Sequence, residues 1–180
     1  AGKLGLKGNT ICFDLNAACS GFVYSMAVAR SIMADMNIAY AMVIGAERLS
    51  KFVNWSDRST CILFGDGAGC AILENSDLAD PGVKSSLAYK LEIEGDYLAG
   101  KYDSNRYLTL DSRFSLDEDK YPYIGMNGRQ IYKFATDVGV KVVDKLLGDR
   151  GLSRDDIELI VPHQANKRII ETLAIKSQIP

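Results

Sequence analysis

Residues 10–47 read TICFDLNAACSGFVYSMAVARSIMADMNIAYAMVIGAE and contain three successive local patterns. The apolar run at 10–15 predicts a buried strand, and the small residues at 17–21 predict a turn after it. Apolar residues within 22–36 recur at three- and four-residue spacing, which predicts a helix. The continuous apolar run at 39–47 predicts a second strand. A strand, a helix and a strand in this order predict a parallel βαβ unit of an α/β protein.

The composition of the whole chain is that of an ordinary globular protein. Its 180 residues are 47% hydrophobic and 24% charged, and the formal net charge is −2. This balance argues against disorder, and the near-neutral charge argues against a nucleic-acid partner. The sequence contains neither an apolar run long enough for a membrane span nor a signal peptide at its start. We therefore expect a soluble protein without a membrane or nucleic-acid partner.

The cysteines indicate the compartment. Cys12, Cys19, Cys61 and Cys70 form no CxxC pair, and each lies in an apolar stretch typical of buried, reduced thiols. A reducing, cytoplasmic environment is the expectation.

A change of composition near residue 75 divides the chain into two predicted domains, 1–77 and 78–180. The segment ENSDLADPGVKSS is polar and contains Pro and Gly, as domain junctions do. The remaining features predicted in the second domain are strands at 87–95, 106–112 and 157–162, an acidic loop at 117–119, a helix from Gly128 that Gly148 and Gly151 stop, a capping box at Ser153 and Asp156, and a helix over 165–175.

Cys19 is a candidate nucleophile. It precedes the predicted helix, where backbone N–H dipoles favour the thiolate, and its small neighbours leave room for a substrate. For an arbitrary cysteine beside Ala and Gly, however, a structural role is the commoner one. Cys12, Cys61 and Cys70 are expected to be structural.

His163 is the only histidine, and VPHQAN places it at the C-terminal end of the predicted strand 157–162. Ligands of open α/β sheets gather at such ends. A catalytic role and a role in capping a loop remain equally open from this position. No second histidine or carboxylate cluster lies nearby, so we predict no metal site.

Three further segments have a structural and a functional interpretation. The glycine-rich FGDGAG (64–69) lacks the spacing and the lysine of nucleotide loops, so its glycines are expected to let backbones pass closely in a sheet. In WSDRST (55–60), an exposed Trp55 and Arg58 can hold an aromatic, phosphorylated ligand, or the segment is a surface loop. The basic last helix, with Arg168, is a solvated face or a dock for an acidic partner.

Taken together, DLNAACSGFVYSM, GAERLS, DRSTCILFGDGAGCAIL, MNGRQIYKFA and VPHQANKRII resemble the successive signature blocks of the β-ketoacyl-acyl-carrier-protein synthase III family, within the thiolase superfamily. The resemblance extends through nearly the whole chain and is weakest over 75–121. It implies a thiolase-like α/β fold: two stacked halves with mixed five-stranded sheets, each half incomplete in this chain, in a homodimer.

The resemblance also implies a reaction. The Cys19 thiolate takes an acyl group from acyl-CoA, and malonyl-acyl carrier protein then loses CO₂ and condenses with that group to start fatty acid synthesis. His163 stabilises the enolate together with an Asn that lies beyond this chain and is not Asn166. Acyl-CoA is a substrate, and no cofactor is implied.

By the same resemblance, Trp55 and Arg58 contact the nucleotide of CoA, while Asn127 and Gly128 line the pantetheine tunnel. Arg168 and Lys133 lie where the carrier protein docks. The resemblance therefore favours a docking role for the basic helix over a solvated face.

The chain covers little more than half of the family's length and lacks both ends, so we expect incomplete sheets and little or no activity from these 180 residues alone. Two alternatives remain: a non-catalytic fragment of the same fold, or another Cys-His acyltransferase of the superfamily that does not condense.

Overall fold

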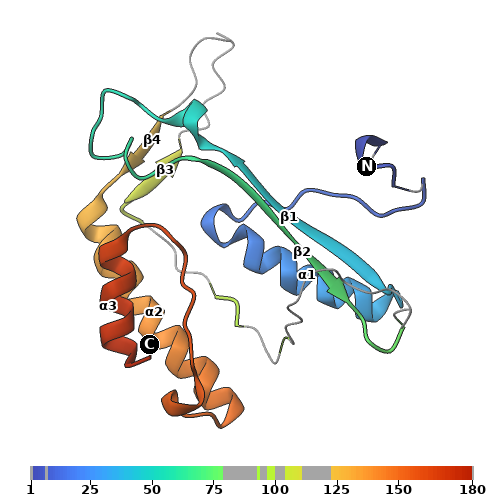
Figure 1. Ribbon diagram of the computed structural model, residues 1–180. Helices are drawn as coiled ribbons and strands as arrows, with labels where there is room; N and C mark the ends of the chain where they lie inside the picture. The colour runs from blue at the N-terminus through green and yellow to red at the C-terminus, as the bar shows by residue number, and fades with distance from the viewer. Residues whose placement is uncertain are drawn as a thin grey trace. The chain divides into compact units, whose positions relative to one another are not determined.

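The computed structural model describes residues 2–6, 8–78, 93, 97–99, 104–110 and 123–179 of the chain. The chain divides into two compact units, each described by itself below. The first comprises Ala1–Gly45 and Gly69–Ala88, and the second comprises Ala46–Ala68 and Tyr89–Pro180. Figure 1 shows the elements: α1 (Gly21–Asp35), β1 (Tyr40–Arg48), β2 (Asp66–Glu74), β3 (Leu108–Leu110), β4 (Ile124–Met126), α2 (Gly128–Arg150) and α3 (Lys167–Ser177).

Helix α1 confirms the helix predicted from apolar spacing over 22–36. It ends where Asn37 adopts a left-handed φ of +52°, a conformation that Asn tolerates better than most residues, and the Ile38 N–H donates to the carbonyl of Met33. Met33 is buried. At the other end of the helix, a Cβ at Gly45 of β1 would lie 3.4 Å from Phe22. Helix α1 therefore packs along β1, as Figure 1 also shows.

Strand β1 confirms the strand predicted at 39–47, but its pairing differs from the prediction. It is hydrogen-bonded to β2 in a two-stranded sheet. The Asn75 N–H donates to the Ala39 carbonyl at 2.9 Å, and Ser50, just after β1, bonds Asp66 at the start of β2. The strands are therefore antiparallel. The parallel βαβ unit predicted from 10–15, the helix and 39–47 is wrong, because residues 10–15 form no strand. A parallel pair needs a crossover element, whereas a loop without an α-helix joins β1 to β2.

Two apolar runs that predicted strands are irregular in the structure. Residues 10–15 and 157–162 contain no strand, so His163 does not follow one. The side chains of Ile11, Phe13 and Val161 are exposed. A strand exists only when a neighbour satisfies its backbone donors and acceptors, and within the described ranges neither run has one. An apolar sequence favours a strand, but a strand forms only where a neighbouring strand pairs with it.

The three cysteines expected to be buried are not. Cys12 and Cys70 are exposed and Cys61 is half-buried, and all four thiols of the chain are free. Their apolar neighbours are themselves poorly covered, which accounts for the difference.

The glycines of FGDGAG also differ from expectation, because a Cβ at Gly65, Gly67 or Gly69 would meet nothing within 4 Å. No close backbone approach requires them among the described residues.

The second unit is built around the antiparallel pair β3–β4 and the helix pair α2–α3. β3 lies inside the strand predicted at 106–112, and its Thr109 is opposite Gly125 of β4. Helix α2 begins after Asn127, as predicted, and ends at Gly151 with a φ of +65°. Gly148 lies inside the helix and does not stop it.

The ends of the remaining helical turns follow local sequence signals. The predicted capping box is confirmed, because Ser153 and Asp156 hydrogen-bond each other reciprocally. Asn166 caps α3 by accepting from the Arg168 N–H at 2.8 Å. The acidic loop at 117–119 and the strand predicted at 87–95, apart from Ile93, lie outside the described residues.

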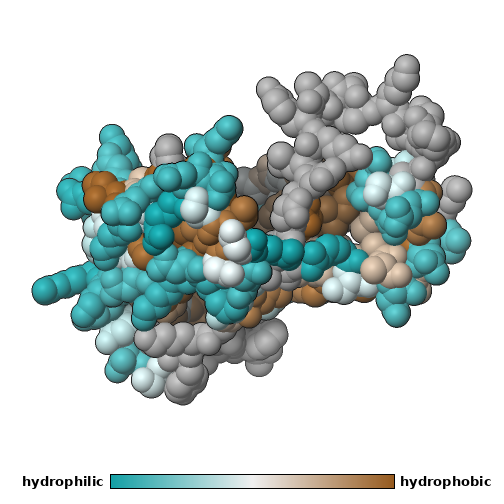
Figure 2. Space-filling model, turned by 90° about the horizontal axis from the view of Figure 1, so that it is seen from below, coloured by the Kyte–Doolittle hydropathy of each residue, from teal (hydrophilic) through white to brown (hydrophobic). Residues whose placement is uncertain are grey.

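Many large hydrophobic side chains are exposed, and Figure 2 shows them as brown atoms that reach the surface between hydrophilic residues. On the sheet β1–β2, residues Tyr40, Met42, Ile44 and Ile72 are exposed, whereas Val43 is buried. None of the helices in the described ranges combines the length and the apolar character needed to cross a membrane.

Candidate active site

Cys19 lies in the first unit, in the 3₁₀ turn Ala18–Ser20 that leads directly into α1. Ala18 holds a left-handed φ of +47°, which is unfavourable for a residue with a Cβ. The Asn16 side chain accepts a hydrogen bond from the Ala18 N–H at 3.0 Å and so closes the turn. Sequence reasoning missed this role of Asn16, although an Asn two residues before a turn amide is a known local signal.

The turn gives Cys19 two properties of a nucleophile. Its side chain is exposed, and it stands at the N-terminal end of a 15-residue helix. Free backbone N–H groups at such an end stabilise an anion. The chemistry that this arrangement favours is attack by a thiolate.

His163 lies in the second unit, in the segment that precedes α3, and it is exposed. Its carbonyl accepts from the Ala165 N–H at 2.9 Å, and the Gln164 side chain donates to the Pro162 carbonyl at 2.9 Å. Together with the Asn166 cap, these bonds fold the chain tightly around the histidine without using its ring. The imidazole is therefore available to a ligand.

Trp55 and Arg58 belong to one loop of the second unit, and both are exposed as expected. Asn54 accepts from the Ser56 N–H at 3.0 Å. Asp57 accepts from the Ser59 N–H and hydroxyl at 2.9 and 2.6 Å and from the Thr60 hydroxyl at 2.8 Å. The Ser59 hydroxyl first, then that of Thr60 and the Ser59 N–H, hold the pKa of Asp57 below its ordinary value.

Asn127 and Gly128 stand at the start of α2. The Asn127 side chain accepts from the Gln130 N–H at 3.3 Å, while its own N–H donates to the Tyr107 carbonyl at 2.7 Å. Asn127 thus joins the helix to the chain next to β3. This anchoring fixes the loop that sequence reasoning assigned to the pantetheine tunnel.

Lys133 on α2 and Arg168 on α3 are both exposed, on two helices that pack together. The Tyr132 hydroxyl lies 2.6 Å from that of Thr172, and Lys176 bonds Asp137 at 3.0 Å. These contacts show that α2 and α3 run in the same direction. Their N-terminal halves carry the two predicted docking residues.

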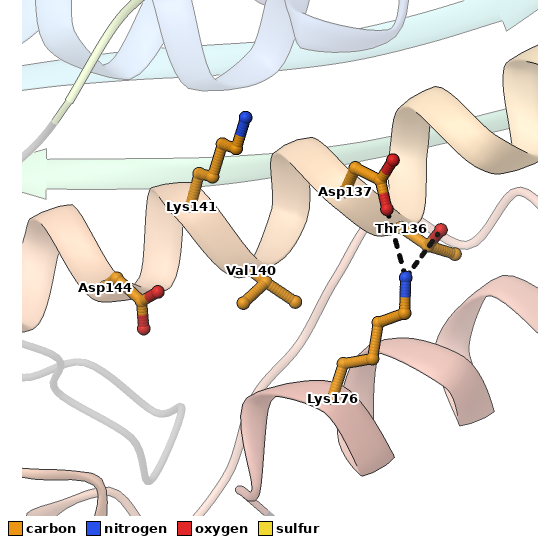
Figure 3. Close-up of a pocket in the computed structure, with 6 residues that line it drawn as sticks. All are labelled: Thr136, Asp137, Val140, Lys141, Asp144 and Lys176. Atoms are coloured by element: carbon orange, nitrogen blue, oxygen red, sulfur yellow. Dashed lines mark hydrogen bonds and ion pairs between the residues drawn. The ribbon is translucent and has the colours of Figure 1, made fainter.

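A shallow hollow lies elsewhere on the α2–α3 pair. It is lined by Thr136, Asp137, Val140, Lys141, Asp144 and Lys176 (Figure 3). Lys176 reaches across from α3 to Asp137 and Thr136, and Asp144 pairs with Arg154. Asp137, Asp144 and Lys176 are in ion pairs, and neither Cys19 nor His163 lines the hollow. In the described part of the chain, no group of three or more His, Cys, Asp or Glu residues is arranged to bind a metal ion.

Comparison with known proteins gives one consistent answer. The sequence profile of the family described as 3-oxoacyl-[acyl-carrier-protein (ACP)] synthase III matches residues 13–94. The β-ketoacyl-[acyl-carrier-protein] synthase III of Acholeplasma laidlawii is 41% identical over 179 residues, which are 99% of this chain and 51% of that protein. The protein of the same name from Clostridium beijerinckii is 43% identical over 169 residues, 93% of this chain and 50% of that protein.

Solved structures agree with the sequence comparison. The crystal structure of 3-oxoacyl-[acyl-carrier-protein] synthase III from Aquifex aeolicus has a TM-score of 0.75 and 37% identity, over 99% of this chain and 52% of that one. The synthase III from Thermus thermophilus has a TM-score of 0.76 and 30% identity, over 99% of this chain and 53% of that one. This chain spans about half the length of the relatives it matches, and by sequence and thiolase-like fold it is a segment of the β-ketoacyl-acyl-carrier-protein synthase III family.

Proposed function

We propose that this chain carries the nucleophile and the histidine of a condensing enzyme that joins an acyl-CoA starter to malonyl-acyl carrier protein and so starts fatty acid synthesis. The observation that carries the proposal is the turn at Cys19, which exposes the thiol at the N-terminus of α1 on a backbone strained at Ala18. Strained backbone of this kind is maintained where it serves a reaction.

In the first half-reaction, the Cys19 thiolate attacks the thioester carbonyl of acyl-CoA. A carbon–sulfur bond forms to Cys19, and the bond to CoA breaks with release of the CoA thiolate. A thiolate stabilised at a helix N-terminus is both a good nucleophile and a good leaving group. The second property matters because the acyl group must leave Cys19 again.

In the second half-reaction, malonyl-acyl carrier protein loses CO₂ and becomes an enolate. An N–H of His163 donates a hydrogen bond to the enolate oxygen and stabilises the developing charge. The enolate carbon attacks the acyl-Cys19 carbonyl and expels the thiolate, which yields the β-ketoacyl carrier protein. His163 suits this task because its side chain is exposed.

The other predicted residues bind the substrates. Trp55 and Arg58 take the nucleotide of CoA, and Asn127 with Gly128 borders the pantetheine arm. Lys133 and Arg168 attract the acidic carrier protein. The proposal includes a cytoplasmic homodimer as the working state.

The decisive experiment is mass spectrometry of the intact chain and of its peptides after incubation with acetyl-CoA. An acetyl group on the peptide that contains Cys19, together with its absence in Cys19→Ser, would establish the nucleophile and an assembled site. No label on any cysteine of the 180-residue chain would instead support the non-catalytic fragment. Acetylation of another cysteine instead of Cys19 would overturn the assignment, and Cys70→Ser serves as the matched exposed-thiol control.

Product analysis with malonyl-acyl carrier protein separates condensation from simple acyl transfer. Release of CO₂ with a β-ketoacyl product supports the proposed reaction. Transfer of the acyl group to the carrier without loss of CO₂ would show an acyltransferase of another kind.

A further inference from the structure

We propose that Asp57 is a positioning residue that keeps the guanidinium of Arg58 open to the phosphates of CoA. This inference rests on the proposed function, because CoA is the ligand that the loop would bind. It adds a residue that binds no substrate itself but determines whether its neighbour does.

The carboxylate of Asp57 is held on both oxygens. One oxygen accepts from the N–H and hydroxyl of Ser59 at 2.9 and 2.6 Å, and the other accepts from the Thr60 hydroxyl at 2.8 Å. The Asp57 carbonyl also accepts from the N–H groups of Thr60 and Cys61 at 3.2 and 3.0 Å. Side chain and main chain of Asp57 thus organise the same turn.

This turn is anchored in the interior of the second unit. Thr60 is only 2% exposed, and Val53, before the loop, is equally buried. The Asp57 N–H donates to the Asn54 carbonyl at 2.9 Å, which closes the other side of the loop. Asp57 therefore links two exposed residues, Trp55 and Arg58, to a fixed support.

The hydrogen bonds of Asp57 occupy the carboxylate that neighbours Arg58 in the sequence. An Asp beside an Arg is an obvious ion-pair partner, and such a pair would neutralise the guanidinium and occupy its donors. In this structure the carboxylate is bound by hydroxyl groups instead, and among the described residues Arg58 makes no ion pair. The guanidinium is exposed, and no described residue occupies its donors, so they can bind an external anion.

The loop contains its own probe. Trp55 is the single tryptophan of the chain and its side chain is 66% exposed, so its fluorescence reports on this loop. The experiment titrates the 180-residue chain with CoA and, separately, with pantetheine, which lacks the nucleotide and its phosphates. Neither titration requires turnover.

Four variants are compared with the wild type. Arg58→Ala removes the anion-binding group, Asp57→Ala removes the positioning carboxylate, and Ser59→Ala releases one carboxylate oxygen toward Arg58. Asp66→Ala is the matched control: Asp66 also accepts two hydrogen bonds from a serine, Ser50, but outside the loop.

The expected result is a graded loss of CoA affinity. Arg58→Ala raises the Kd for CoA about tenfold or more, the loss typical of a hydrogen-bonded charge pair, and Asp57→Ala and Ser59→Ala raise it about three- to tenfold. Asp66→Ala leaves it unchanged. Pantetheine affinity stays the same in all variants, which a merely structural role of Asp57 would not produce.

Different negative results contradict different parts of the proposal. Loss of CoA affinity in Arg58→Ala with wild-type affinity in both Asp57→Ala and Ser59→Ala overturns the positioning role. Equal loss for CoA and pantetheine in Asp57→Ala overturns it as well, because it shows general damage. A wild-type chain that binds no CoA, and is not acetylated at Cys19, overturns the proposal for these 180 residues and supports the non-catalytic fragment.

Discussion

Gly139 of α2 lies so close to Leu173 of α3 that a Cβ atom on Gly139 would overlap the Cδ2 atom of Leu173. Leu173 is buried, so its side chain has little freedom to move away. The two helices therefore approach each other at a point where a larger residue than glycine would displace the Leu173 side chain. The position of α3, and of Arg168 at its start, depends on this contact.

We predict that Gly139→Ala destabilises the chain although alanine is the better helix former. The helix gains about 1 kcal/mol from alanine, but overpacking a buried contact costs about 1–3 kcal/mol. Gly148→Ala is the matched control, because Gly148 lies in the same helix and a Cβ there would meet nothing within 4 Å. Urea unfolding should show opposite signs for the two variants, and equal stabilisation by both would contradict the close contact.

A second substitution tests the same contact from the other side. Leu173→Ala creates a cavity and should cost about 2–5 kcal/mol alone. Combined with Gly139→Ala, it should cost less than the sum of the two changes, because the added methyl group fills the space that was emptied. Strict additivity in the double-mutant cycle would show that the residues do not touch.

Asn16 should matter for acylation of Cys19. Asn16→Ala removes the acceptor for the Ala18 N–H, so the strained turn loses its support. Losing one such bond costs about 1 kcal/mol, which corresponds to a several-fold slower acylation of Cys19 by acetyl-CoA. Ala18→Gly, which relieves the left-handed φ, is the companion variant and should raise the stability; slower acylation in this variant would show that the strain at Ala18 serves the reaction. A rate unaffected by Asn16→Ala would remove Asn16 from the site.

Acid should weaken the anchor between Ser50 and Asp66. The Ser50 N–H, then its hydroxyl, hold the pKa of Asp66 in the folded chain below its ordinary value. A depressed folded-state pKa stabilises the fold above the unfolded pKa of about 3.9, and this contribution is lost as the pH falls through the lower, folded value. The free energy of unfolding, measured from pH 5 to pH 2, should therefore fall less steeply in Asp66→Asn. Identical slopes would show that Asp66 has no pKa difference between the two states.

The exposed side chains Met42, Ile44 and Ile72 should make the isolated chain self-associate. They form one apolar face of β1–β2, and Ile72 is 65% exposed. Exposed apolar faces and unpaired sheet edges favour association and dye binding. Light scattering and binding of a hydrophobic dye should both decrease in Ile72→Lys, whereas Glu74→Lys, on the polar end of the strand, should change them little. A monomeric wild-type chain at high concentration would contradict this prediction.

Local features of the fold were predictable from the sequence. The helix over 22–36, the strand at 39–47 and the capping box at Ser153 all depend on neighbours within a few residues. The strands expected at 10–15 and 157–162 failed for the opposite reason, since a strand needs hydrogen bonds from a distant segment. The buried state expected for Cys12 and Cys70 failed likewise, because covering a side chain requires other elements to pack on it.

The candidate site also combines residues that local sequence identifies with residues that only the structure identifies. Cys19, His163, Trp55 and Arg58 can be selected from residue type and motif, and their catalytic and binding roles remain predictions from those motifs. Asn16 and Asp57 were missed because their importance lies in which backbone and hydroxyl groups their oxygens reach.

What the sequence by itself determined is therefore the family, the helices and the chemistry that its side chains can perform. Tertiary structure alone decided that β1 and β2 are antiparallel, that Gly139 lies against Leu173, and that the Asp57 carboxylate accepts from Ser59 and Thr60. The physical reason is the distance along the chain over which each interaction acts. Helix periodicity and caps act over one or two turns, whereas strand pairing, close packing and the choice among hydrogen-bond partners depend on which groups folding brings together.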